Sequence, residues 1–181
     1  LTQNMKDSKT ASRYAKALLE LSQEGGALEE VFADMNSLSA TLAESADLRS
    51  LVKNPVIKGE EKSKVFKALF SSQFNEITMN TIDLLVNNKR ETLLSETATQ
   101  FVGLYKASKN IVTAEVSSAF SLDEEQKKNI VALLKHDGEV EIIEKIDPSL
   151  IGGFIVRVGD KQIDASVATK FKNLRKEISL N

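Results

Sequence analysis

Apolar residues in the first hundred positions recur with a helical period. Between Thr10 and the pair Gly25 and Gly26, four apolar side chains follow the i, i+3, i+4, i+7 spacing of one helix face: Tyr14, Ala17, Leu18 and Leu21. Glycine commonly follows the last turn of a helix. Similar stripes predict further helices over about 27–42, up to Asn54 before Pro55, and over 59–70, 74–88 and 91–107. Six amphipathic helices with short connections predict an N-terminal bundle over residues 1–106.

The pattern changes at about Lys109, where Val, Ile and Thr become frequent. Apolar positions then alternate as in a half-buried strand, at Val112, Ala114 and Val116. Ser121 and Glu124 match a capping box, which predicts a helix up to His136 with Gly138 as a left-handed C-cap residue. Residues 139–147 and 150–158 have strand patterns again.

A β-hairpin is predicted around Gly159 and Asp160. If these two residues form a type II′ turn, Val158 faces Lys161, and the next two pairs match in polarity: Arg157 with Gln162, and Val156 with Ile163. Asp164 or Ser166 can then cap a final helix. The order strand, helix, strand, strand, strand, helix predicts a small α+β domain over 107–181, so the fold class is mainly α: a six-helix bundle followed by an α+β unit.

Composition and charge reduce the number of possible functions. The chain has 181 residues, a formal net charge of −2, no cysteine and one histidine. These values argue against disulfides, cysteine-based metal sites and general nucleic-acid binding, which relies on a basic surface. No apolar run approaches the roughly 20 residues that span a bilayer. The polar start, LTQNMKDSKT, does not resemble a signal peptide.

The residues that could carry chemistry do not form a site. Five residues separate Gly153 from Gly159, and Asp160 stands where a phosphate-binding loop has lysine. His136 fits a helix C-terminus, where the helix dipole favours positive charge. The acidic run from Asp123 to Glu125 fits a first helical turn for the converse reason. We therefore predict no catalytic, cofactor-binding or metal-binding residues.

The first helix has apolar side chains around more of its circumference than one core contact requires. These are Ala11, Tyr14, Ala15, Ala17, Leu18, Leu19 and Leu21. Small residues such as Ala15 and Ala17 would let a partner helix approach closely. Burial in the core explains the same pattern, so periodicity alone leaves both interpretations open.

Five segments together carry a family resemblance. RYAKALLEL near the start, Asn54-Pro55, LLVNNKRETLL from Leu84, AEVSSAFSLDEEQ from Ala114 and IDPSLIGGFIVRVGDKQIDAS from Ile146 occur in one family's order and spacing. The chain resembles the delta subunit of bacterial and chloroplast F-type ATP synthase, called the oligomycin-sensitivity-conferring protein in mitochondria. The resemblance covers nearly the whole length, and the last segment is the most specific. Its signature residues are Asp147, Pro148, Gly152, Gly153, Gly159, Asp160, Asp164 and Ser166. Ala165 departs from the glycine of many members.

The resemblance implies a non-catalytic stator subunit, present in one copy and without cofactors. In the family, the first and fifth helices of the bundle bind the N-terminal helix of an alpha subunit on the catalytic head. The C-terminal domain meets the C-terminal end of the b subunits in the peripheral stalk. Carried over, the partner-binding residues are Tyr14, Ala17, Leu18, Leu21, Ile77, Thr81, Leu84 and Asn88.

The implied location is peripheral to the membrane, through the complex, on the cytoplasmic face of a bacterial inner membrane or the equivalent organellar face. A helical regulatory or scaffold protein with an α+β interaction domain is the alternative from residue patterns alone.

Overall fold

A computed structural model describes the backbone of residues 2–134 and 137–179, and their side chains apart from 2–6, 173, 174 and 176–179. The chain divides into two compact units, Leu1–Tyr105 and Lys106–Asn181. The first unit is helical, and the second combines a four-stranded sheet with two helices. The predicted fold class, mainly α with a small α+β part at the C-terminus, is confirmed.

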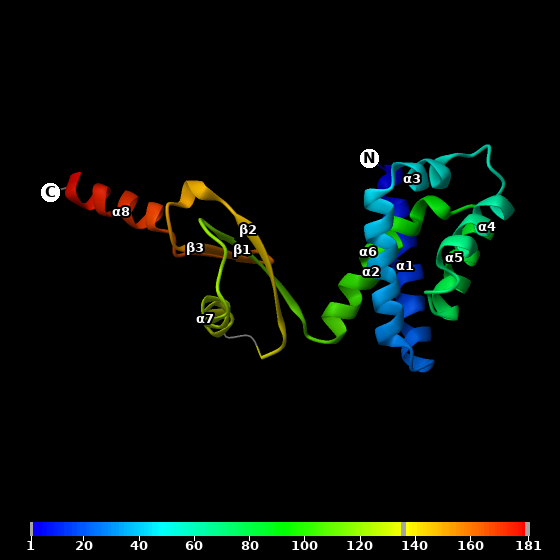
Figure 1. The fold of residues 1–181 in the computed structure, drawn as a ribbon, viewed down its shortest axis with the longest axis horizontal. Helices are drawn as coiled ribbons and strands as arrows, with labels where there is room; N and C mark the ends of the chain where they lie inside the picture. The colour runs from blue at the N-terminus through cyan, green and yellow to red at the C-terminus, as the bar shows by residue number, and fades with distance from the viewer. Residues whose placement is uncertain (1, 135–136, 180–181) are drawn as a thin grey trace. The chain divides into compact units, whose positions relative to one another are not determined.

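Six α-helices make up the described part of the first unit (Figure 1). They are α1 (Thr2–Glu24), α2 (Leu28–Glu44), α3 (Ala46–Lys53), α4 (Gly59–Phe70), α5 (Glu76–Asn87) and α6 (Leu94–Ser108). The helix α1 begins well before the predicted start at Thr10, because the polar residues ahead of the stripe include no Gly or Pro that would stop it. Ahead of α6, the residues Glu91–Leu93 form a 3₁₀ turn, η1, instead of the predicted first turn of the helix.

The core of the bundle is formed by apolar side chains from α1, α2, α4, α5 and α6. Those that are almost completely buried include Leu18, Leu38, Phe66, Ile82 and Phe101. One buried carboxylate ties α2 to the start of α5: Asp34 accepts hydrogen bonds from the Asn75 backbone N–H at 2.7 Å and from the Thr78 hydroxyl at 2.8 Å. This contact fixes where α5 begins, and therefore which of its faces points away from the core.

The sheet of the second unit has the strand order β2-β1-β3-β4. β1 (Val112–Ser118) pairs in parallel with β2 (Val140–Ile146) and antiparallel with β3 (Phe154–Val158), which pairs antiparallel with β4 (Lys161–Asp164). The helix α7 (Glu124–Leu134) connects the two parallel strands. Its Ile130 joins a core cluster with Ala114, Val116, Leu122 and Val156, so α7 covers one face of the sheet.

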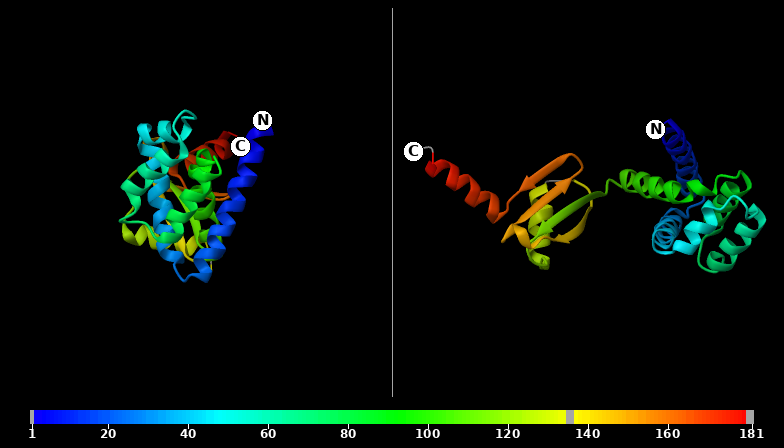
Figure 2. Two further views of the ribbon diagram at one scale, coloured as in Figure 1. Left: turned by 90° about the vertical axis from the view of Figure 1, so that its right-hand side faces the viewer. Right: turned by 90° about the horizontal axis from the view of Figure 1, so that it is seen from above.

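The hairpin has the register that its polarity pattern predicts. Val158 pairs with Lys161, Arg157 with Gln162, and Val156 with Ile163. Gly159 has a φ of +55°, whereas the φ of Asp160 is not positive, which is the combination that a type II′ turn has. The hairpin leads into α8 (Val167–Ser179), as the orange strands and red helix of Figure 2 show.

Two predictions about the ends of α7 were wrong. The capping box is formed by Asp123 and Gln126 instead of Ser121 and Glu124: each backbone N–H donates to the other residue's side chain, at 3.0 Å and 2.7 Å. Gly138 does not have a left-handed conformation. A Cβ at this position would lie 2.0 Å from the carbonyl oxygen of Asn110, so close packing of two backbone segments requires the glycine. His136 lies outside the described residues.

Candidate partner-binding site

The helices α1 and α5 run side by side in the first unit (Figure 1). An open groove lies between them. It encloses a hollow of about 260 Å³, lined by Leu21, Ile77, Asn80, Thr81 and Leu84. Leu21 is 54% exposed and Leu84 is 50% exposed, so each helix contributes a large apolar side chain that the bundle leaves half uncovered. The structure thus brings together four of the residues proposed for partner binding, and it adds Asn80.

Thr81, in the floor of the groove, has a hydroxyl group that is already hydrogen-bonded within its own helix. Its side chain is almost fully buried, and its hydroxyl donates to the Ile77 carbonyl oxygen at 2.9 Å. This internal bond leaves mainly methyl and methylene groups facing the hollow. The groove is therefore suited to an apolar ligand surface.

One predicted groove residue belongs to the core instead. Leu18 is only 1% exposed, and it lies on a buried stripe of α1 with Ala11, Ala15 and Ser22. The spacing of these four residues places them on the face toward the bundle, whereas Ala17 and Leu21 remain exposed on the neighbouring face. Leu18 therefore offers no surface to a partner.

The opposite end of the groove from Ile77 is polar. Tyr14 is half-buried there, and its hydroxyl accepts hydrogen bonds from the Asn88 amide at 3.3 Å and from the Arg90 guanidinium at 3.2 Å. The Arg90 guanidinium also lies 5.9 Å from the centre of the Tyr14 ring. Tyr14 and Asn88, both proposed for partner binding, meet here. Arg90 was not among the proposed residues, although it lies within the segment LLVNNKRETLL.

The first signature residues of the second unit build a turn. Asp147 accepts hydrogen bonds from the Ser149 backbone N–H at 3.0 Å and its hydroxyl at 2.6 Å, and Pro148 opens the 3₁₀ turn η2 (Pro148–Leu150). The Ser149 donors hold the pKa of Asp147 below its usual value, because they stabilise the charged carboxylate. The segment DPS is thus a local structure with no reactive group left over.

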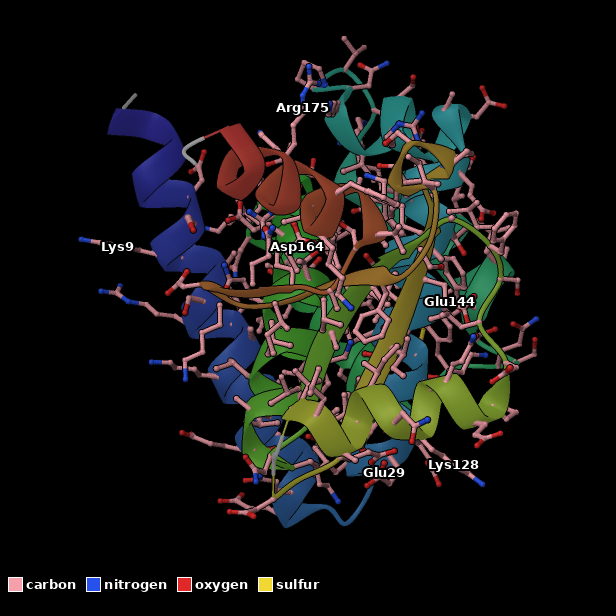
Figure 3. The ribbon with its side chains drawn as sticks, turned by 90° about the vertical axis from the view of Figure 1, so that its left-hand side faces the viewer. Lys9, Glu29, Lys128, Glu144, Asp164 and Arg175 are labelled. Atoms are coloured by element: carbon pink, nitrogen blue, oxygen red, sulfur yellow. The ribbon has the colours of Figure 1, made fainter. Side chains whose placement is uncertain are left out.

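The remaining signature residues join the hairpin to α8. The Gly152 carbonyl accepts from the Val167 N–H at 2.9 Å. Asp164, at the end of β4 (Figure 3), accepts from the Ser166 N–H at 2.9 Å and from the Thr169 hydroxyl at 2.8 Å, and these donors lower its pKa. Ser166 caps the helix by accepting from the Thr169 N–H at 3.2 Å. The glycine-rich segment is therefore architecture, in agreement with the hairpin prediction.

Comparisons with known proteins identify the family. A family profile described as "ATP synthase delta (OSCP) subunit" matches residues 10–178. The chain is 33% identical to ATP synthase subunit delta of Cytophaga hutchinsonii over 97% of both chains. It is 35% identical to the chloroplastic subunit delta of Ochrosphaera neapolitana over 94% of this chain and 97% of the relative. A chain in the cryo-EM structure of the Toxoplasma gondii mitochondrial ATP synthase hexamer is similar with a TM-score of 0.69 at 26% identity, covering 93% and 96% of the two chains.

The chain belongs to the ATP synthase delta (OSCP) family.

Membership in the delta (OSCP) family confirms the prediction of a non-catalytic stator subunit of F-type ATP synthase. The family consists of structural subunits of the complex and not of catalytic enzymes. Among the residues that the structure describes, no three His, Cys, Asp or Glu side chains gather as a metal site would require. None of the described helices combines the length and apolar character that crossing a bilayer demands.

The second unit of this delta-family chain also exposes large apolar side chains. Phe120 is 75% exposed and Ile151 is 69% exposed. Phe120 borders a hollow of about 310 Å³ together with Gly152, Gly153 and Phe154. Ile151 has φ +64° and ψ −34°, an unusual conformation for a β-branched residue. Neither residue was predicted as functional, because a single exposed apolar residue in a loop gives no periodic signal.

Proposed function

We propose that the groove between α1 and α5 receives the N-terminal helix of an ATP synthase alpha subunit, and that the second unit meets the C-terminal end of the b subunits. One copy of the chain would thereby join the catalytic head to the peripheral stalk. The family membership supports a linker of this kind, and the surface chemistry of each unit supports these two partners.

The observation that carries the first assignment is the exposure of Leu21 and Leu84 on opposite walls of one apolar hollow. An amphipathic helix in such a groove would bury both side chains with its own apolar anchors, spaced by three or four residues. Because buried apolar contacts near the centre of an interface contribute most of its binding energy, these two leucines are the expected centre.

The second assignment is supported by the apolar surface around Phe120 and Ile151. Exposed apolar side chains next to a hollow are typical of protein-binding surfaces. The partner would be a helix of the stalk that covers Phe120 and the hollow beside it. This surface belongs to the second unit alone, so head binding and stalk binding would use separate parts of the chain.

The mechanical role follows from these two attachments. A stator must hold the head still while the rotor turns, and a joint of this kind needs slow dissociation more than fast association. Apolar interfaces suit this requirement, since charges at an interface rim mainly change association rates and salt dependence. Through the stalk, the chain would lie peripheral to the membrane, on the cytoplasmic face in a bacterium or on the equivalent face in an organelle.

The assignment of the groove is tested with a synthetic peptide of the first 25 residues of the alpha subunit from the same source. Its affinity for the full chain is measured by calorimetric titration. The Leu84→Asp substitution should weaken binding by at least roughly tenfold, because a carboxylate would be desolvated at the centre of the interface.

Leu69→Asp is the matched control, since Leu69 is 49% exposed but lies on α4, outside the groove. It should leave the affinity unchanged. Equal affinities of the parent chain and a folded Leu84→Asp variant would reject the groove as the binding site. For the second unit, co-purification of b subunits with the chain should be lost on Phe120→Asp and retained in the Leu69→Asp control.

A further inference from the structure

The two ends of the groove differ in charge. At one end, Arg90 is held beside Tyr14 by the hydrogen bond to its hydroxyl and by its position near the ring. Arg90 and the adjacent Lys89 are both exposed, so this end presents positive charge to solvent. The hydroxyl accepts both hydrogen bonds that the described residues make to it, and its own proton can serve a further acceptor. This end is therefore suited to a carboxylate.

The other end is acidic. Glu24 is exposed and is the last residue of α1, three positions after Leu21 and seven after Ala17, so it projects from the same side of the helix as these groove residues. The last turn of α1 contains no basic residue. A basic side chain is therefore favoured here.

The position of Gly25 confirms that this end belongs to the same groove. A Cβ at Gly25 would lie 3.0 Å from the Cδ1 atom of Ile77, a lining residue of the hollow. Tyr14 contacts Asn88 just beyond the C-terminus of α5, whereas Gly25 packs near Ile77 close to its N-terminus. The two helices are thus antiparallel, and the groove runs from Arg90 to Glu24.

We infer that the groove selects a helix whose charges match its two ends: an acidic side chain at the Arg90 end, a basic side chain at the Glu24 end, and apolar anchors between them. This inference rests on the proposed function, in which a helix occupies the groove. Tyr14 and Glu24 are ten residues apart on α1, or about 15 Å at 1.5 Å per residue. Two charges about eleven residues apart would span this distance on one face of the partner, because about eleven residues make three full turns.

This charge order determines which end of the partner helix lies at which end of the groove. The apolar hollow would accept an amphipathic helix in either direction, since burial of apolar surface is not directional. In the reversed direction the partner's basic group would meet Arg90 and its acidic group would meet Glu24. Two like-charge contacts would disfavour that arrangement, so the charges supply orientation while the leucines supply most of the affinity.

The test uses the same alpha-subunit peptide and the full chain, at low and at physiological salt. Arg90→Glu and Glu24→Lys should each weaken binding by roughly three- to tenfold at low salt, and by less as salt is raised, because the pairs are exposed and screened. The acidic peptide residue nearest one end of its apolar face is then changed to Lys, and the basic residue about eleven positions away to Glu. The first changed peptide should restore binding to Arg90→Glu, and the second to Glu24→Lys.

A matched control is Lys64→Glu, which reverses an exposed charge on α4 away from the groove. It should alter binding by less than either groove variant. Unchanged unfolding midpoints of all variants would exclude a general loss of structure.

The outcomes separate the two proposals. If the parent chain does not bind the peptide, the proposed function itself fails. If the parent binds but neither charge reversal matters, or if the changed peptides restore nothing, the inferred charge order is overturned while the groove assignment stands. A peptide without acidic and basic residues at the required spacing that binds as tightly as a charged one would overturn it as well.

Discussion

Gly153 and Ala165 approach so closely that a side chain at the glycine would collide with the backbone of the alanine. A Cβ built at Gly153 lies 2.4 Å from the Ala165 carbonyl oxygen, and the glycine has a φ of +74°. Two features therefore require glycine at this position: the left-handed backbone conformation and the close approach of the Ala165 backbone. The sequence pattern alone could not separate these two causes, because both select the same residue.

Replacing Gly153 should destabilise the second unit strongly. For Gly153→Ala we expect a loss of about 2–6 kcal/mol in the free energy of unfolding, the sum of backbone strain and overpacking. Gly159→Ala is the control, since Gly159 also has a positive φ of +55° but nothing lies within 4 Å of its added Cβ. It should lose only the strain contribution of about 1–3 kcal/mol. Urea unfolding of both variants measures the difference, and equal losses would refute a role for the contact with Ala165.

Replacing Ile151 by glycine should relieve backbone strain at this position. Its φ of +64° with ψ −34° is costly for a β-branched residue, and its 69% exposure means that little burial is lost with the side chain. We expect Ile151→Gly to stabilise the second unit by about 0.5–2 kcal/mol, after the entropy that glycine adds to the unfolded chain is subtracted.

Ile146→Gly is the comparison for this prediction. Ile146 is 61% exposed but ends the regular strand β2, so its replacement should destabilise the unit. Thermal unfolding of the two variants should thus shift in opposite directions. A destabilised Ile151→Gly chain would mean that the side chain contributes more than its conformation costs.

Local patterns predicted the fold where neighbours in sequence are neighbours in space. The hairpin register is an example, because one turn at Gly159 fixes which residues of β3 and β4 face each other. The pairing of Val112 with Val140 is different: β1 and β2 are parallel and are joined through α7, so no local turn sets their register. Such long-range pairs depend on packing across the whole unit.

The candidate site was predictable only in part, for a related reason. The spacing of Leu18 and Leu21 places both on one broad stripe, but only the packed bundle decides that Leu18 is buried and Leu21 exposed. Likewise, Ser121 and Asp123 both begin plausible capping boxes, with Glu124 and Gln126. Leu122, which lies between Ser121 and Asp123, is buried in the core, and the helix begins only at Glu124. Asp123 is therefore the capping residue. Arg90 has no periodic signal, and its contact with Tyr14 joins residues 76 positions apart.

Asp164 should contribute stability that depends on pH. The Ser166 backbone N–H, the Ser166 side chain and the Thr169 hydroxyl stabilise its carboxylate and lower its pKa in the folded chain. A carboxyl with a lowered folded pKa contributes fully above its unfolded pKa of about 3.9, and the contribution declines as the pH falls from there through the folded pKa. The stability difference between the parent and Asp164→Asn should therefore be larger at pH 7 than at pH 3. Urea unfolding at both pH values tests this, and a difference independent of pH would contradict it.

Lys62 is a buried charge, and its contribution to the free energy of unfolding can be measured. It is 1% exposed, and its ammonium group donates to the Val52 carbonyl at 3.0 Å and pairs with Glu91, which is 15% exposed. Lys62→Met would leave Glu91 without its partner in a largely buried place. We expect a loss of about 3–5 kcal/mol, because an unpaired buried charge costs more than the pair contributes.

The double variant Lys62→Met with Glu91→Leu decides whether the pair itself stabilises the bundle. It removes both charges together with the Glu91 Oε2 atom, which has no hydrogen-bond partner among the described residues, so we expect stability within about 1 kcal/mol of the parent. Lys67→Met is the exposed control: Lys67 is 55% exposed and pairs with Asp83 at 2.8 Å, and its loss should cost at most about 1 kcal/mol. In urea unfolding of the three variants, only Lys62→Met should show a large loss in the free energy of unfolding. If the double variant were as unstable as Lys62→Met, the attraction between the two charges, and not the cost of an unpaired one, would be what holds α4 against η1.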